Sequence, residues 1–243
     1  MKRESLEGLI RRAANRIGID IQRYRPRSTE LARLAAMLAT HNVDFVIDVG
    51  ANEGQFAKGL RAAGYPGHIL SFEPLPEPHA RLERASAADG GWDIAQRVAL
   101  GDHNGEVEIH VSANSVSSSV LQMLASHLNA APDSRSVGVE RVHLSTLDAM
   151  MRGHSALGLA PFLKIDTQGY EDQVLSGASE LVSRLVGVHL ELSLVPLYEG
   201  QALYDAMLSR LQREGFAIWA IWPGICDPES GRMLQVDATL FRA

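Results

Sequence analysis

The sequence predicts an α/β fold, in which a seven-stranded, mostly parallel sheet carries helices on both faces and follows an N-terminal helical appendage. From residue 43 onward, short runs rich in Val, Ile, Leu and Phe alternate with longer segments of helical periodicity, which is typical of successive βαβ units. The chain has 243 residues, of which 46% are hydrophobic, so one such domain can bury its own core. We expect the appendage over residues 1–40 and the α/β domain over residues 41–243.

Turn residues mark the ends of the predicted elements. The first strand ends at Gly50, the helix after it ends at Gly64, and prolines at 74, 76 and 78 suit the turn into the next helix. A turn-rich segment over 223–231 separates the last two strands. The expected strands are 43–49, 68–73, 94–100, 162–166, 187–193, 216–221 and 236–242, and the expected helices are 54–63, 77–88, 171–184 and 201–214.

Residues 101–158 interrupt this alternation. The segment 106–111 alternates polar and apolar residues, as a half-exposed strand does, and a second such strand is expected at 139–144. Ser145 can then cap a short helix with Asp148 in its first turn. We interpret 101–158 as an insertion that shapes a substrate pocket, and its serine-rich run at 112–119 is expected to be a loop.

Charge is unevenly distributed along the chain. The net charge of −6 argues against a protein that binds nucleic acid, because neutralising phosphates needs surplus Lys and Arg. Residues 1–27 hold eight Lys or Arg and three Asp or Glu, a net of +5, which leaves −11 for the remainder. Their apolar residues fall near one helical stripe. We favour a helix docked on the acidic domain; the alternative is peripheral membrane contact through residues 1–27.

Cys226 is the only cysteine, so an intramolecular disulfide is impossible and a reducing compartment is favoured. No thiolate metal cluster can form, and no metal site is predicted. The N-terminus lacks the apolar run of a signal peptide, and no stretch approaches the roughly 18 apolar residues of a membrane span. We expect a cytoplasmic protein.

The ends of the first two strands predict a nucleoside site. Gly50 and Gly54 permit a tight turn ahead of a helix whose first N–H groups are unpaired. A dinucleotide fingerprint would need a glycine where this chain has Asn52, which makes an NAD(P) oxidoreductase a distant alternative. Glu73 ends the second strand and can accept hydrogen bonds from vicinal ribose hydroxyls. S-adenosylmethionine, a nucleoside without a diphosphate, has the expected shape, with Asp48 and the glycine turn facing its amino-acid end.

The ends of the fourth and fifth strands supply candidates for catalysis. Asp166 is placed across the crevice from the first strand. Lys164 alternates inward with it and is expected to pair with a carboxylate. Glu171 suits either the first turn of a helix or a catalytic role. His189 and Glu191 are polar residues of a strand expected to be covered on both faces, which makes them candidates for a base or for orienting one.

Three blocks of the chain resemble the FkbM family of S-adenosylmethionine-dependent methyltransferases. These are FVIDVGANEGQF (45–56), LSFEPLPE (70–77) and FLKIDTQGYEDQVLSGA (162–178), of which the third is the most specific. The resemblance spans about residues 43–242 and implies the Rossmann-like fold of class I methyltransferases. Members act as O-methyltransferases on hydroxyls of macrolides, sugars and glycolipids. A further similarity is to the enzymes that methylate the terminal deoxysugar of phenolic glycolipids.

The resemblance also implies roles for particular residues. It implies that cofactor contacts come from Asp48, Gly50, Asn52, Gly54, Glu73, Val98 and Ala99, with Glu73 on the ribose and the last two near the adenine. It further implies that Asp166 lies beside the reacting centre. The resemblance does not identify a catalytic base in this chain. We rank Asp166 first as the base or as the residue that orients the hydroxyl, ahead of His189, Glu191 and Glu171.

The predicted function is therefore O-methylation of a sugar hydroxyl, on a glycolipid or another glycosylated natural product. One alternative is a metal-assisted O-methyltransferase of a non-sugar small molecule, with Asp166 and Glu191 as Mg²⁺ ligands. Another is a non-catalytic nucleoside-binding scaffold of the same fold. An N-methyltransferase of nucleobases is disfavoured, because Thr167-Gln168-Gly169 stands where such enzymes often carry an Asn/Asp-Pro-Pro-aromatic motif.

Overall fold

The computed structural model describes residues 6–19, 29–152 and 160–243. Its main sheet has seven strands in the order β3-β2-β1-β7-β8-β10-β9. The strands are β1 (Phe45–Val49), β2 (His68–Phe72), β3 (Trp92–Ile94), β7 (Pro161–Ile165), β8 (Gly187–Ser193), β9 (Phe216–Pro223) and β10 (Gln235–Arg242). Neighbours pair in parallel except β10, which is antiparallel to β8 and β9. The predicted seven-stranded, mostly parallel sheet is confirmed.

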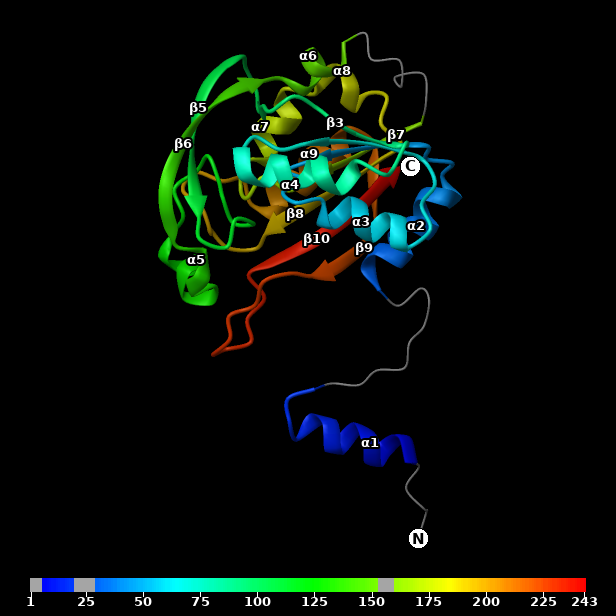
Figure 1. Ribbon diagram of the computed structural model, residues 1–243, viewed down its shortest axis with the longest axis vertical. Coiled ribbons are helices and arrows are strands. Elements are labelled where there is room, and N and C mark those ends of the chain that lie inside the picture. The colour runs from blue at the N-terminus through cyan, green and yellow to red at the C-terminus, as the bar shows by residue number, and fades with distance from the viewer. Residues whose placement is uncertain (1–5, 20–28, 153–159) are drawn as a thin grey trace.

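Helices cover both faces of this sheet, as expected (Figure 1). One face packs against α6 (Leu147–Met151), α7 (Glu171–Ser176), α8 (Ser179–Val182) and α9 (Tyr204–Arg213), and the other against α2 (Glu30–Thr40), α3 (Gln55–Ala62) and α4 (Pro76–Ser86). Alternate residues of each strand enter alternate cores: Ile47 lies in the first cluster and Val46 in the second. The central strands are consequently apolar almost throughout, because both of their faces are buried.

Strand order reverses beside β1. The chain winds outward from β1 through β2 to β3, then returns to place β7 on the other side of β1. In open α/β sheets, ligands bind beyond the carboxyl ends of the strands at such a reversal. The residues that follow β1, β2 and β7 therefore meet at one crevice.

The expected third strand at 94–100 is wrong in its bounds. The chain contributes only Trp92–Ile94 to the edge of the main sheet, and Ala99–Leu100 forms a separate strand, β4. β4 joins β5 (Gly105–Ser112) and β6 (Ser136–Ser145) in a second sheet of order β4-β6-β5. Between β5 and β6 lie α5 (Ala125–Ala130) and a 3-10 turn, η1 (Pro132–Ser134). An apolar run alone does not show which of two sheets its residues will join.

The expected helix at 171–184 is also wrong, because it is broken at Gly177 into α7 and α8. A Cβ at Gly177 would lie 1.9 Å from the carbonyl oxygen of Gly101, so this glycine lets the insertion cross the helix pair closely. Asp148 caps α8 by accepting hydrogen bonds from the amides of Glu180 and Leu181, both at 2.9 Å. The cap of α6 is Thr146 and not Ser145.

The N-terminal appendage comprises two helices with different surroundings. α2 packs into the domain, where Leu34 and Leu38 are fully buried in the same cluster as β1. Figure 1 shows α1 (Leu6–Asn15) apart from the domain, unlike the docked position that the sequence favoured. Ile10 and Ile17 are exposed there. Contact of residues 1–27 with a membrane stays a prediction, and residues 1–5 and 20–27 lie outside the described residues.

None of the described helices combines the length and the apolar character that crossing a bilayer would need.

Candidate active site

The turn after β1 brings two strand ends into close contact. Gly50 has φ of 73°, and a Cβ there would lie 1.9 Å from the carbonyl oxygen of Asp166. Only glycine therefore allows the ends of β1 and β7 to approach this closely. Gly54, with φ of 82°, has a different neighbour: its Cβ would lie 2.5 Å from Cη2 of Trp92. It lets α3 begin against this ring and does not line the pocket described below.

Glu73 and Asn52 form the next part of the site. The Glu73 carboxylate accepts hydrogen bonds from the backbone amides of Asn52 and Leu75, each at 2.9 Å. The Asn52 side chain donates to Ser115 of the insertion at 3.3 Å, and its backbone has φ of 48°. Burial raises the pKa of Glu73 from 4.5 to about 7, although both backbone donors act to lower it. Two of the roughly four acceptor positions of the carboxylate remain available to a ligand.

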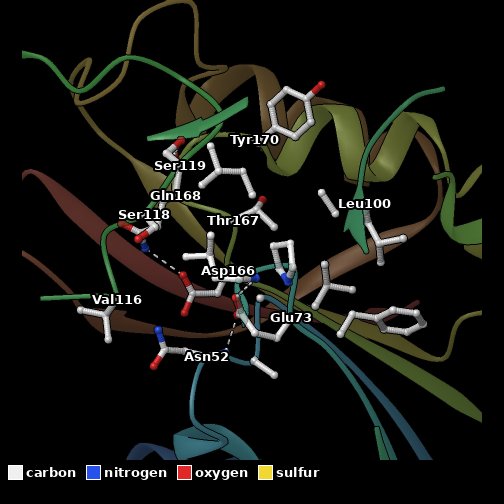
Figure 2. Close-up of a pocket in the computed structure, with 18 of the residues that line it drawn as sticks. Asn52, Glu73, Leu100, Val116, Ser118, Ser119, Asp166, Thr167, Gln168 and Tyr170 are labelled. Carbon is white, nitrogen blue, oxygen red and sulfur yellow. Dashed lines mark hydrogen bonds between the residues drawn. The ribbon is translucent and has the colours of Figure 1, made fainter. Parts of the chain in front are cut away.

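A pocket of about 210 Å³, here called the central pocket, opens beyond these strand ends. Figure 2 shows Asn52 and Glu73 at one end of it and Ser119 and Tyr170 at the other. Its apolar wall combines Phe72, Leu75, Val98, Ala99, Leu100, Ile109, Val116 and Val120. Its polar lining includes Asn52, Glu73, Ser115, Ser118, Ser119, Lys164, Asp166, Thr167 and Gln168. The cavity thus joins an apolar slot to a carboxylate and to a row of hydroxyl groups.

Asp48 lies beneath the central pocket and does not line it. Its side chain is fully buried, with one oxygen 3.0 Å from Nζ of Lys164 and the other accepting from the Ser71 hydroxyl at 3.1 Å. The two charged residues are register partners on β1 and β7. Burial by itself would lower the pKa of Lys164, but the Asp48 and Asp166 carboxylates beside it raise this pKa overall. In this structure Asp48 holds Lys164 in place.

Asp166 stands at the end of β7 and lines two pockets. Its Oδ2 lies 3.6 Å from Nζ of Lys164, and its Oδ1 accepts a hydrogen bond from Nε2 of Gln168 at 2.8 Å. The same lysine donates to the carbonyl oxygen of Gly50 at 2.9 Å. The side chain of Asp166 keeps 36% of its surface exposed, which leaves room for a ligand to reach the carboxylate.

Glu171 organises the turn that follows Asp166. Its Oε1 accepts hydrogen bonds from the amides of Thr167 and Gly169, at 2.9 and 3.1 Å, and from the Thr167 hydroxyl at 3.1 Å. The residue is buried and does not line either pocket, and burial raises its pKa. These contacts support the helix-start role for Glu171 over the catalytic one.

A second cavity of about 220 Å³, here called the lateral pocket, lies beside the central one on the face covered by α2 and α3. Phe56, Lys164 and Asp166 line both cavities, and the lateral pocket adds Glu30, Leu31, Ile165, His189, Glu191 and Asp237. Register places His189 next to Lys164 on one side and Thr239 on the other, and Glu191 next to Asp237. A polar stripe therefore runs across four neighbouring strands, from Asp48 on β1 through Lys164 and His189 to Thr239 on β10.

The lateral pocket contains two of the predicted catalytic candidates. Nδ1 of His189 pairs with the Thr239 hydroxyl at 2.9 Å, and its Nε2 lies 3.5 Å from a Glu30 oxygen. Burial, aided by the charge of Lys164, lowers the pKa of His189 to about 4, so the ring is neutral at physiological pH. Burial and the neighbouring Asp166 and Asp237 carboxylates raise the pKa of Glu191. The structure thus places both residues beside Asp166 and outside the central pocket.

Asp166 and Glu191, the two carboxylates of the metal-assisted alternative, share one neutral donor. Nε2 of Gln168 lies 2.8 Å from the first and 2.6 Å from the second. Across the residues that the structure describes, no three His, Cys, Asp or Glu side chains converge in a group that could hold a metal ion.

Several residues of the site carry no local signal in the sequence. Gln168 contacts the carboxylates, and Tyr198 contacts Gln168, through the fold alone. Glu30 comes from the N-terminal appendage. The serine-rich segment was predicted only to be a loop of the insertion. Its hydroxyl groups line the central pocket. The signal that could have found these hydroxyl groups is the run of serines itself.

Comparison with known proteins identifies the family. The family model described as the methyltransferase FkbM domain matches residues 48–218, well over half of the chain. The chain belongs to the FkbM methyltransferase family. It is accordingly a methyltransferase, and its methyl donor is S-adenosylmethionine. The resemblance seen in the three sequence blocks is confirmed at this level.

One curated relative of this FkbM-family chain is the 2-O-methyltransferase NoeI of Sinorhizobium fredii, which is 27% identical over 173 residues. The match covers 68% of this chain and 70% of the relative. Among solved structures, magnesium protoporphyrin IX methyltransferase (ChlM) of Synechocystis PCC 6803, with bound SAM, is 12% identical with a TM-score of 0.46, covering all of both chains. An S-adenosylmethionine-dependent methyltransferase of Mesorhizobium loti is 12% identical with a TM-score of 0.44, covering 90% of this chain and all of the other.

The residues of the central pocket fit this cofactor. Val98 and Ala99 offer an apolar slot for an adenine, Glu73 has acceptor positions left for ribose hydroxyls, and Gly50 leaves space where any Cβ would collide with backbone. Five of the seven predicted contacts line the pocket, namely Gly50, Asn52, Glu73, Val98 and Ala99, whereas Asp48 and Gly54 do not.

Proposed function

We propose that this FkbM-family methyltransferase transfers the methyl group to a hydroxyl oxygen of a sugar, on a glycolipid or another glycosylated product. The observation that carries the proposal is the position of Asp166, which lines both the central pocket and the adjoining lateral pocket. An acceptor in the lateral pocket can therefore place a hydroxyl group next to the carboxylate and next to the cofactor. The NoeI relative is a 2-O-methyltransferase, which supports transfer to oxygen.

The lining of the lateral pocket favours a neutral polyol as acceptor. Its carboxylates, Glu30, Asp166, Glu191 and Asp237, accept hydrogen bonds, and sugar hydroxyls donate them. The ring of Phe56 and the side chain of Leu31 supply apolar surface for the ring carbons of a sugar. An anionic acceptor would instead be repelled by the same carboxylates.

S-adenosylmethionine supplies an electrophilic methyl group when it is bound. The protein must hold the acceptor oxygen in line with it, exclude water and receive the hydroxyl proton. Asp166 can orient the hydroxyl and take its proton, because Lys164 and Gln168 fix its carboxylate while one side stays open. His189 and Glu191 lie within the same pocket, where they can orient other hydroxyl groups of the acceptor. The phenolic glycolipid acceptor remains a prediction.

The proposal is tested by methyl transfer from labelled S-adenosylmethionine to a panel of glycosides and glycolipids. We expect labelled O-methyl sugar from the wild-type protein, and a loss of about 10²- to 10⁴-fold in kcat for Asp166→Asn with cofactor affinity retained. Asp172→Asn, an acid-to-amide change outside both pockets, is the matched control. The proposal is wrong if the protein binds the cofactor but methylates no sugar, or if Asp166→Asn turns over at the wild-type rate.

A further inference from the structure

One neutral side chain links the two central carboxylates of the site. Nε2 of Gln168 donates to Oδ1 of Asp166 at 2.8 Å and to Oε2 of Glu191 at 2.6 Å. An amide nitrogen has two hydrogens, so both bonds can form at once. The two carboxylates stand on neighbouring strands, β7 and β8, and the amide lies between them.

The orientation of this amide is determined by its other end. Oε1 of Gln168 accepts a hydrogen bond from the Tyr198 hydroxyl at 2.8 Å. Burial, together with the nearby Glu191 carboxylate, raises the pKa of Tyr198, so the hydroxyl keeps the proton that it donates. A flipped amide would point its oxygen at two carboxylates and its nitrogen at a donor. The amide therefore has one stable orientation.

The backbone around Gln168 is built to present the side chain in this place. Gln168 has φ of 55°, and its carbonyl oxygen accepts from the Ser119 hydroxyl at 2.7 Å. Gly169 is the next residue, where an added Cβ would lie 3.1 Å from side-chain atoms of Tyr198. The Glu171 carboxylate closes the turn from below by accepting from the amides on either side. A backbone conformation that is rare for non-glycine residues indicates that the surroundings require it.

We propose that Gln168 is a positioning residue of the methyl transfer. It holds the carboxylates of Asp166 and Glu191 through one amide nitrogen, so that Oδ2 of Asp166 faces the acceptor hydroxyl at the junction of the two pockets. This inference rests on the proposed function, because the acceptor hydroxyl enters through it. Tyr198 acts through Gln168 and touches neither carboxylate directly.

A neutral donor suits this position for an electrostatic reason. The amide belongs to a cluster of charged and titratable groups. These are Lys164 on β7, Asp166 directly after it, Glu171 on α7, His189 and Glu191 on β8, Asp237 on β10, Glu30 on α2 and Tyr198. Acids outnumber bases in this group. A carboxylate in place of the amide would add to the repulsion, whereas the amide donates a hydrogen bond to each carboxylate and adds no charge.

The test compares Gln168→Met with Gln168→Glu. At similar volume, Met removes the two hydrogen bonds to the carboxylates and the one from Tyr198, whereas Glu inserts a carboxyl group. For Gln168→Met we expect kcat to fall about 10- to 100-fold, since hydrogen bonds to charged groups are lost, while the cofactor Kd changes less than about threefold. For Gln168→Glu we expect kcat to fall as pH rises, because the new group loses its only hydrogen when it ionises. The wild-type profile should lack this fall. Gln212→Glu, on the exposed side of α9, is the matched control.

A second measurement does not depend on turnover. Carboxyl NMR of the cofactor-free protein, assigned with Glu191→Gln, follows the ionisation of Glu191. Because a donor to the charged form holds a carboxyl pKa down, we expect Gln168→Met to raise the pKa of Glu191 further. Tyr198→Phe should act in the same direction, more weakly, and should have no added effect on kcat or pKa in the Gln168→Met background.

The outcomes separate the two proposals. If the wild-type protein methylates no sugar, the proposed function fails, and an unchanged Glu191 titration in Gln168→Met would overturn the positioning role as well. If wild-type turnover is observed, unchanged kcat in Gln168→Met together with a wild-type pH profile in Gln168→Glu overturns the positioning role alone. Should Gln168→Met fail to fold, Tyr198→Phe removes a single hydroxyl: lower kcat supports the inference and unchanged kcat overturns it.

Discussion

We predict that the buried carboxylate of Glu73 makes cofactor binding depend on pH, because we expect it to accept hydrogen bonds from the ribose. In the protein without a ligand, burial raises the pKa of Glu73 from 4.5 to about 7. A shift of that size corresponds to about 3 kcal/mol against the ionised form. Ribose hydroxyls that donate to the carboxylate stabilise the ionised form, so binding must release a proton wherever Glu73 is protonated beforehand. Affinity for S-adenosylmethionine is therefore full above pH 7 and is lost as pH falls below it.

The magnitude follows from this pKa. For a group that titrates near 7 and must be ionised to bind, the dissociation constant rises about tenfold between pH 8 and pH 6. In Glu73→Gln the group cannot ionise, so this dependence disappears. The amide also cannot accept from both backbone N–H groups and both hydroxyls, so at pH 8 we expect binding to weaken by about 2 kcal/mol, or about thirtyfold.

Isothermal titration calorimetry between pH 5.5 and 8.5, in buffers of different ionisation enthalpy, measures both the affinity and the protons released. Glu77→Gln is the matched control, because this side chain is 84% exposed, three residues beyond the pocket residue Pro74, and lines neither pocket. The control should bind as the wild type does. Equal wild-type affinity at pH 6 and pH 8 with no proton release would refute the reasoning, as would an unchanged pH dependence in Glu73→Gln.

Two further predictions concern the support of the site. Gly50→Ala should lower the free energy of unfolding and abolish cofactor binding, since its Cβ would meet the Asp166 carbonyl oxygen at 1.9 Å. Gly64→Ala is the control, because Gly64 has φ of 89° and nothing lies within 4 Å of the added Cβ. It should lose only the backbone strain of about 1–2 kcal/mol in the free energy of unfolding. Equal losses of stability in the two variants, measured by thermal unfolding, would contradict the close approach at Gly50. Lys164→Met should lose about 3–5 kcal/mol in urea unfolding by leaving Asp48 buried without its cation. Adding Asp48→Asn should restore part of that loss, and a double variant as unstable as the sum of the single ones would show that the pair is not coupled.

Residues whose positions follow from short, fixed spacings along the chain were predictable from the sequence. The two glycines after β1 and the glutamate that ends β2 have fixed spacings within one βαβ unit, so their meeting at the strand ends follows from the connection alone. The same reasoning placed Asp166 near the end of β1, and the parallel pairing of β1 with β7 confirms this position. Lys164 was expected to pair with a carboxylate, and it lies beside two.

Residues that act through distant partners were not predictable. The sequence placed Asp48 against the cofactor, but the structure turns its side chain toward Lys164 on the neighbouring strand. Which side a strand residue faces is decided by the alternation of the strand, and what it meets there depends on a register that one sequence does not show. The lateral pocket shows this most clearly, because Glu30 and Asp237 reach it from opposite ends of the chain.

By itself the sequence determined the α/β class, the glycine turn with the glutamate that follows the next strand, and the family, because each depends on local periodicity or on short, fixed spacings. The tertiary structure alone decided that 94–100 divides between two sheets, that α2 belongs to the core and that Gln168 lies between two carboxylates under the control of Tyr198. These features depend on contacts between residues far apart in the chain, whose free energies arise only once the strands are in register and the helices are packed.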